Sequence, residues 1–252
     1  MSNIHIKDKL SAARQDESDF VNRFNKLTLK HVIQIVILSA FTWFVTICLM
    51  NTVLYLNDII FNLFKKNHPL FFLLIFTVAI LRSYLYHKTF FKGAFGDGAT
   101  DTIKFLHNTY AKDRTKKVIK NELMTLQSIT LGLKRVFITI LTIGLGGSGG
   151  LEGPAIPIGE SFGRGFAKYF QLASIERFRI FQMCGIAAAI STLLHAPLTG
   201  CIFACEVVFA GHFIYPFIIY GMVGSLTAFI LSNHLLDHSG FLLITVNHGQ
   251  AY

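Results

Sequence analysis

Residues 146–159 read GGSGGLEGPAIPIG, a glycine-rich turn followed by one carboxylate, Glu152, and two prolines. Long apolar segments lie on both sides of this stretch, so Glu152 is expected at membrane depth, where an ionisable side chain is a functional candidate. Pro154 and Pro157 lack an N–H and clash with a preceding turn, which the first turn of a helix tolerates. The prolines therefore predict a helix that begins at about Gly153.

The start of this predicted helix is suited to bind an anion. Its free N–H groups, from Gly153, Ala155, Ile156 and the neighbouring glycines, carry a partial positive charge of about half a unit. Such a helix end attracts anions. The Glu152 carboxylate is placed to occupy the same position, so it would compete with a diffusible anion until it is protonated.

Two other interpretations of this stretch were weighed against the anion site. Glu152 as a plain helix cap would contribute a few tenths to about 1 kcal/mol, but between segments 129–146 and 153–170 a carboxylate risks a desolvation cost that a cap does not offset. Residues 144–149 also match the dinucleotide fingerprint G-x-G-x-x-G. That fingerprint requires a strand and a soluble βαβ unit, whereas the preceding apolar run has the length of a helix.

The composition supports a membrane setting. Of 252 residues, 52% are hydrophobic and 15% are charged, and 25 are Phe. Apolar stretches of about 17 to 25 residues suit a bilayer, and the candidates are 31–61, 69–86, 129–146, 180–194 with 196–210, and 213–232. Segments 99–110, 153–170, 176–193 and 196–210 are short or interrupted by Gly and Pro, as at transport sites. An all-α integral membrane protein is predicted.

The basic residues of this chain flank its apolar runs. The net charge is +9, but no aromatic-interleaved basic face is present, so no nucleic-acid partner is expected. Residues 1–30 lack the pattern of a cleaved signal peptide and, with the basic linker 111–122, are predicted to face the cytoplasm. Residues 31–235 are expected to form one membrane domain, in the inner membrane, and 236–252 a short polar tail or truncated linker.

Cysteine and histidine give no metal or catalytic pattern. The four cysteines, Cys48, Cys184, Cys201 and Cys205, lie inside apolar runs without zinc-like spacing, which favours buried packing. His195, beside Pro197 at a break between two apolar segments, is the one histidine considered for a role beyond local hydrogen bonding. No enzyme activity, cofactor or metal is therefore expected.

Three ordered motifs resemble those of the CLC family of chloride channels and proton/chloride antiporters. The first is Gly150-Leu151-Glu152-Gly153-Pro154 with Ile158-Gly159 and Gly163-Arg164, similar to G-[RK]-E-G-P-x-x-x-I-G. The others are residues 185–189, similar to G-A-A-A-G, and residues 195–206, similar to N-A-P-L-x-G-x-x-F-x-x-E. The resemblance implies broken helices that meet at the membrane midplane with their N-termini toward a central chloride. Glu152 falls on the external gating glutamate.

Several positions depart from the family pattern. The family's inner chloride-binding G-S-G-I-P element falls at Gly96-Asp97-Gly98-Ala99-Thr100, where Asp97 replaces the serine. A carboxylate beside an anion repels it by about 4 kcal/mol at 4 Å for an effective dielectric of 20, so this turn is expected to be a diverged inner site. Val207 stands where antiporters carry the inner proton-relay glutamate, which leaves Glu206, or Asp97, as a possible proton path.

The length of the chain is the largest departure. CLC subunits resemble two inverted halves, and these 252 residues end after what resembles the last helix of the first half. A lone half would expose interface groups to lipid, so a second-half chain or a second copy is the expected partner. The sequence predicts chloride transport, with a non-conducting membrane subunit or truncated remnant as the alternative.

Overall fold

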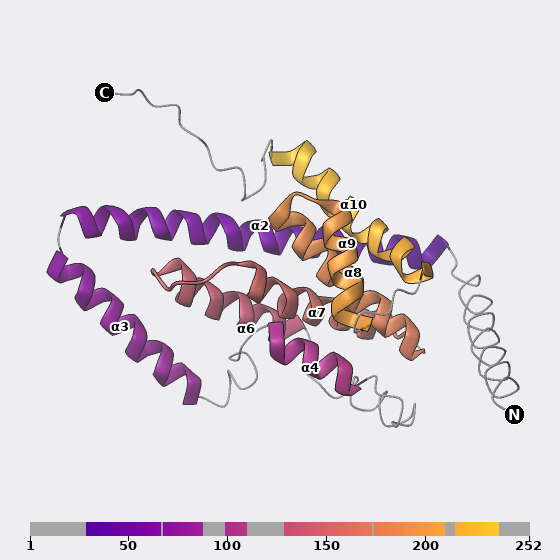
Figure 1. Ribbon diagram of the computed structural model, residues 1–252, viewed down its shortest axis with the longest axis horizontal. Helices are drawn as coiled ribbons and strands as arrows, with labels where there is room; N and C mark the ends of the chain where they lie inside the picture. The colour runs from indigo at the N-terminus through magenta and orange to yellow at the C-terminus, as the bar shows by residue number, and fades with distance from the viewer. Residues whose placement is uncertain are drawn as a thin grey trace, which may run out of the picture.

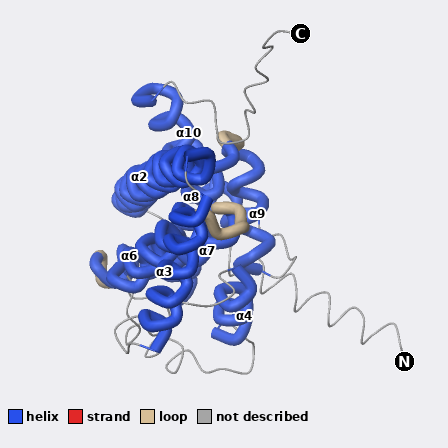
Figure 2. Tube along the Cα trace, turned by 90° about the vertical axis from the view of Figure 1, so that its left-hand side faces the viewer, coloured by secondary structure: helices blue, strands red, loops and turns tan. Residues whose placement is uncertain are grey.

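The computed structural model describes residues 29–66, 68–87, 99–109, 129–172, 174–209 and 215–236. Every regular element in these ranges is a helix, as Figures 1 and 2 show. The all-α prediction is thereby confirmed for the described part of the chain. The elements are α2 Leu29–Lys66, α3 His68–His87, α4 Ala99–Thr109, α6 Ile129–Thr139, the π-helical η2 Ile140–Gly144, α7 Glu152–Tyr169, α8 Ile175–Leu194, α9 Pro197–Phe209 and α10 Tyr215–Leu236.

The helices reproduce the predicted apolar segments. Three are long and apolar enough to cross a membrane, within Lys30–Lys66, Ile175–Leu194 and Phe217–Leu235, and shorter apolar stretches lie at Phe71–Leu81 and Pro197–Val207. The first span is longer than the predicted segment 31–61, because α2 continues through Asn62-Leu63-Phe64-Lys65 to Lys66. The short segments predicted at 99–110 and 153–170 are α4 and α7.

The core is built around α8, which packs against α7, α9, α10 and α2 (Figure 1). Helices α7 and α8 approach closely at Gly159 and Gly185, and a Cβ on Gly159 would lie 2.5 Å from the Gly185 carbonyl oxygen. Small residues at such a crossing let helix backbones touch, which is how helices associate in membranes. Two motif glycines that lie far apart in the sequence are therefore packing partners.

A glycine-rich turn connects α6 and η2 to α7. Gly146 adopts φ of +93°, a left-handed value that favours glycine, and the Gly147 N–H donates to the Thr142 carbonyl oxygen at 2.9 Å. Residues 146–150 are exposed. Helix α7 then begins at Glu152, one residue before the predicted start.

The sulfur and imidazole side chains have structural surroundings. Cys184, Cys201 and Cys205 are buried as predicted, but Cys48 is exposed, so the packing prediction is wrong there. Cys48 lies on a face of α2 that the described part of the chain leaves exposed. His195 ends α8 in a left-handed conformation, and its Nε2 lies 2.7 Å from the Asn233 side-chain oxygen of α10. This is a local hydrogen bond between helix ends.

Candidate functional site

Glu152 is the first residue of α7. The residue before it, Leu151, gives no side-chain cap to the helix, and Pro154 has no N–H. The amides of Glu152 and Gly153 belong to the first turn and so have no acceptor within the helix. The helix start thus presents uncapped donors beside a carboxylate.

Two of the predicted anion donors are used inside the helix in this conformation. The Ala155 N–H donates to the Leu151 carbonyl oxygen at 3.0 Å, and in a helix that begins at Glu152 the Ile156 N–H reaches back to the Glu152 carbonyl. The set Gly153, Ala155 and Ile156 is therefore corrected to the amides of Glu152 and Gly153. The correction follows from the helix starting one residue earlier than expected.

The Glu152 side chain turns back onto the glycine-rich loop. A Cβ placed on Gly150 would collide with Glu152 Oε2, so the absence of a side chain at Gly150 makes room for the carboxylate. Glu152 is half-buried in this position. Its charge consequently lies beside the N-terminal end of its own helix, where the helix dipole stabilises a negative group.

The other predicted site residues lie apart from Glu152. Gly96, Asp97 and Gly98 fall outside the described residues, and α4 begins directly after them at Ala99. Glu206 is exposed on α9, and the neighbouring Val207 is buried. The carbonyl oxygen of Val207 lies 3.2 Å from His107 Nε2 on α4. Sequence reasoning missed this histidine, whose only signal is its place in the last turn of the short polar helix.

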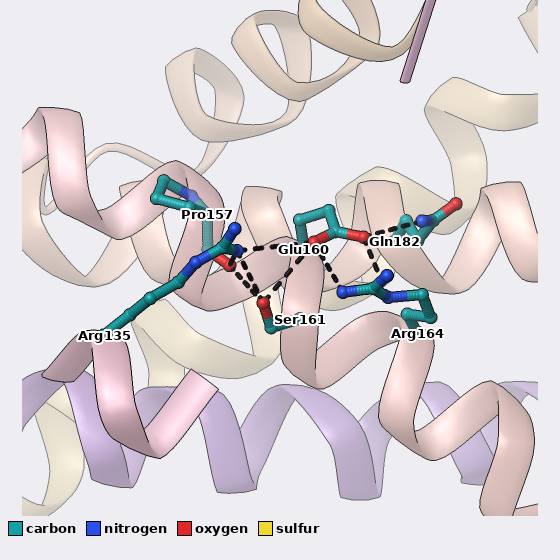
Figure 3. A network of polar contacts seen from close by, with 6 residues as sticks. All are labelled: Arg135, Pro157, Glu160, Ser161, Arg164 and Gln182. Carbon is teal, nitrogen blue, oxygen red and sulfur yellow. Dashed lines mark hydrogen bonds and ion pairs between the residues drawn. The ribbon is translucent and has the colours of Figure 1, made fainter. Parts of the chain in front are cut away.

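A buried ionic cluster, also missed, joins α6, α7 and α8 (Figure 3). Glu160 is 1% exposed and Arg164 2%. Gln182 Nε2 donates to Glu160 Oε1 at 2.8 Å, and Arg164 Nε lies 3.2 Å from the same oxygen. We call this set the Glu160 cluster, and its members are Arg135, Pro157, Glu160, Ser161, Arg164 and Gln182.

Arg135 reaches the cluster from α6. Its Nη1 donates to the Pro157 carbonyl oxygen and to Ser161 Oγ, both at 2.7 Å, and lies 3.6 Å from Glu160 Oε2. Two arginines thus share one carboxylate, and the cluster carries a net charge of one positive unit. Buried charges without counter-charges and hydrogen bonds are costly. Glu160 directly follows the motif that ends at Ile158-Gly159, which was the available sequence signal.

The arrangement defines a class of protein: a multi-pass helical membrane protein whose broken helix presents amides and a carboxylate at one point. Residues 78–250, more than half of the chain, match the family described as Voltage gated chloride channel. The chain belongs to this family. The match includes the motifs at 150–164, 185–189 and 195–206.

Two proteins similar in sequence to this chain carry the names of a chloride channel and a chloride exchanger. A putative chloride channel protein ClcB-like from Ralstonia nicotianae is 32% identical over 28% of this chain and 17% of its own length. A H(+)/Cl(-) exchange transporter ClcA from Vibrio cholerae is 32% identical over 36% of this chain and 20% of its own length. The matched part is thus a small share of each relative.

A solved structure shows the same fold. The crystal structure of a eukaryotic CLC transporter matches with a TM-score of 0.63 and 17% identity, over 85% of this chain and 39% of that chain. The chain is therefore an integral membrane protein with the fold of part of a CLC transporter.

Proposed function

We propose that this chain supplies one half of a chloride-transporting CLC protein and that Glu152 is its gate. The observation that carries the proposal is the Glu152 carboxylate, turned onto Gly150 beside the uncapped start of α7. A carboxylate there satisfies the helix end in the absence of an external anion. Protonation or displacement of that side chain frees the Glu152 and Gly153 amides for chloride.

The family resemblance and the names of the relatives support chloride as the transported ion. One relative carries the name of a chloride channel and another that of a proton/chloride exchanger. In this chain Val207 is apolar at the position of the proton-relay glutamate, and Glu206 is exposed beside it. Glu206 is accordingly our candidate for an inner proton acceptor, and the diverged turn Gly96-Asp97-Gly98 is our candidate for the inner anion site.

The remaining part of the pore comes from another polypeptide in this proposal. The chain corresponds to 39% of the solved transporter, and we propose a second-half chain or a second copy as the partner that supplies the other half of the anion site. The assembly lies in the lipid bilayer of the inner membrane, transports chloride without a cofactor and is not an enzyme. A non-conducting subunit or remnant is the alternative, favoured by Asp97 at the inner turn.

Chloride efflux from proteoliposomes tests this proposal. The purified chain is reconstituted alone and after co-expression with a chain that carries the second half of a CLC protein, and each preparation is compared with its Glu152→Gln variant. We expect selective flux only with the partner, and a flux in the variant that depends less on external pH because the competing carboxylate is gone. Absence of flux in every preparation would favour the non-conducting subunit.

An unchanged pH profile in Glu152→Gln, with the protein level and fold intact, would contradict the gating role. Selective flux from the chain alone, with mass spectrometry showing no partner, would instead refute the need for a second chain. Two copies of this half would then have to form the pore.

A further inference from the structure

We propose that Glu160 is a positioning residue that fixes α7 along its axis and thereby holds the Glu152 carboxylate beside the glycine-rich loop. This inference rests on the proposed gating function of Glu152. Glu160 lies eight residues after Glu152, about 12 Å along the helix. It therefore acts through the helix, without contact to the anion.

The contact between α7 and α8 needs such a fixed point. Its closest backbone approaches are at Gly159, Gly163 and Gly185. Glycines have no side chains that interlock, so at these points the backbones touch without a side chain that fixes the register. The Gln182 amide, which donates to Glu160 Oε1 at 2.8 Å, fixes the register because a hydrogen bond is short and directional.

The loop that precedes Glu152 also depends on the cluster. Residues 146–150 are exposed and contain one side chain larger than hydrogen, that of Ser148. The position of the loop therefore follows from its two flanking elements, α6 with its continuation η2 on one side and α7 on the other. Arg135 of α6 ties these elements together through the Pro157 carbonyl oxygen and Ser161 Oγ, both at 2.7 Å.

The cluster extends to α4, the helix that follows the candidate inner anion turn. The Arg164 guanidinium lies over the Phe105 ring of α4, 5.3 Å from its centroid, and the same arginine pairs with Glu160. A cation over an aromatic face is attracted to it. One carboxylate thus relates the helix that starts at the gate to the helix that starts at the inner turn.

The charge of the cluster suggests a variant that removes the fixed point without adding buried charge. Glu160→Gln alone leaves Arg135 and Arg164 without a counter-charge inside the Glu160 cluster, which endangers folding. The double variant Glu160→Leu/Arg164→Leu keeps the net charge of one positive unit, and leucine cannot accept the hydrogen bond from Gln182, whereas glutamine could. Glu176→Gln, in the first turn of α8 and outside the cluster, is the control for removal of an acidic charge.

A cysteine at Ser148 reports on the position of Glu152. Cys48 is replaced by serine, because it is the exposed one among the native cysteines, whereas Cys184, Cys201 and Cys205 are buried. The chain is placed in lipid nanodiscs, and the modification rates of Ser148→Cys by an anionic and by a neutral methanethiosulfonate are measured. The ratio of the anionic rate to the neutral rate depends on the charge near the loop, and its measurement does not require chloride transport.

We expect Glu152→Gln to raise this ratio about threefold in the otherwise unchanged chain, the factor for two unit charges about 8 Å apart in nearly aqueous surroundings. In the double variant the factor should fall to near one, because α7 no longer holds the carboxylate at the loop, and in Glu176→Gln it should stay near threefold. A purely structural role would lower the melting temperature and leave the factor unchanged.

The proposal would be overturned if Glu152→Gln still raised the labelling ratio about threefold in a folded double variant. It would also be overturned if Glu152→Gln left the ratio unchanged in the otherwise unchanged chain. Chloride flux is measured on the same proteins as a separate readout. Absence of flux in every variant counts against the proposed function alone, since the labelling factor still decides whether Glu160 positions Glu152.

Discussion

The substitution Gly159→Ala tests the glycine contact between α7 and α8. The new Cβ would lie 2.5 Å from the Gly185 carbonyl oxygen and 2.9 Å from the Ile186 Cα. These are backbone atoms of a buried helix, so one helix has to move by roughly an ångström to restore van der Waals distances. Overpacking of a dense core costs about 1–3 kcal/mol, and the rigid backbone places this site in the upper part of that range.

The same helix offers a matched control in Gly153→Ala, since nothing lies within 4 Å of a Cβ at that position. Alanine improves helix propensity by up to about 1 kcal/mol in both variants, which leaves a net destabilisation of about 2 kcal/mol for Gly159→Ala. For a chain of this size 1 kcal/mol corresponds to about 2–4 °C in Tm.

Thermal unfolding in detergent, followed by circular dichroism, is the assay. We expect the Tm of Gly159→Ala to fall by about 4–8 °C and that of Gly153→Ala to stay level or rise slightly. Equal melting temperatures for the two variants would show that α7 and α8 do not meet at Gly159, and would refute the packing described here.

Three further predictions concern topology, the α2–α10 contact and the inner turn. An impermeant thiol reagent added outside intact cells should label Lys66→Cys and spare Lys116→Cys, and efficient labelling of the latter would reverse the orientation. Trp43 Nε1 donates to Ser232 Oγ at 2.8 Å, so Trp43→Phe and Ser232→Ala should each cost about 1–3 kcal/mol in unfolding experiments. Their double variant should cost less than the sum, and full additivity would argue against the bond. Asp97→Ser should raise chloride flux only when the second half is present, and an increase in the chain alone would contradict the missing-half argument.

The helices, and the place of Glu152 at a helix start, were predictable from the sequence for clear physical reasons. Apolar length determines where a span is possible, and Pro154 and Pro157 limit where a helix begins. The prediction placed the start of α7 at about Gly153, one residue late, because Pro154 can occupy the third position of a helix as well as the second. That single residue changed which amides are free.

The Glu160 cluster was not predictable in the same way. Arg135 and Glu160 lie on different helices and are 25 positions apart in the sequence. Hydropathy shows that both are near apolar runs, but only the packing of α6 against α7 shows that the two side chains meet. The contact between Gly159 and Gly185 could not be predicted for the same reason, since local sequence patterns do not give the angle at which helices cross.

The length of α2 has a consequence for the membrane around the protein. Its 38 residues extend about 57 Å at 1.5 Å per residue, nearly twice the roughly 30 Å of a bilayer's hydrocarbon core. At the average tilt of about 20°, about 54 Å of helix would still lie along the bilayer normal. Helix α2 therefore has to lean steeply or continue into the aqueous phase, and the protein should respond to the thickness of the lipid chosen for reconstitution.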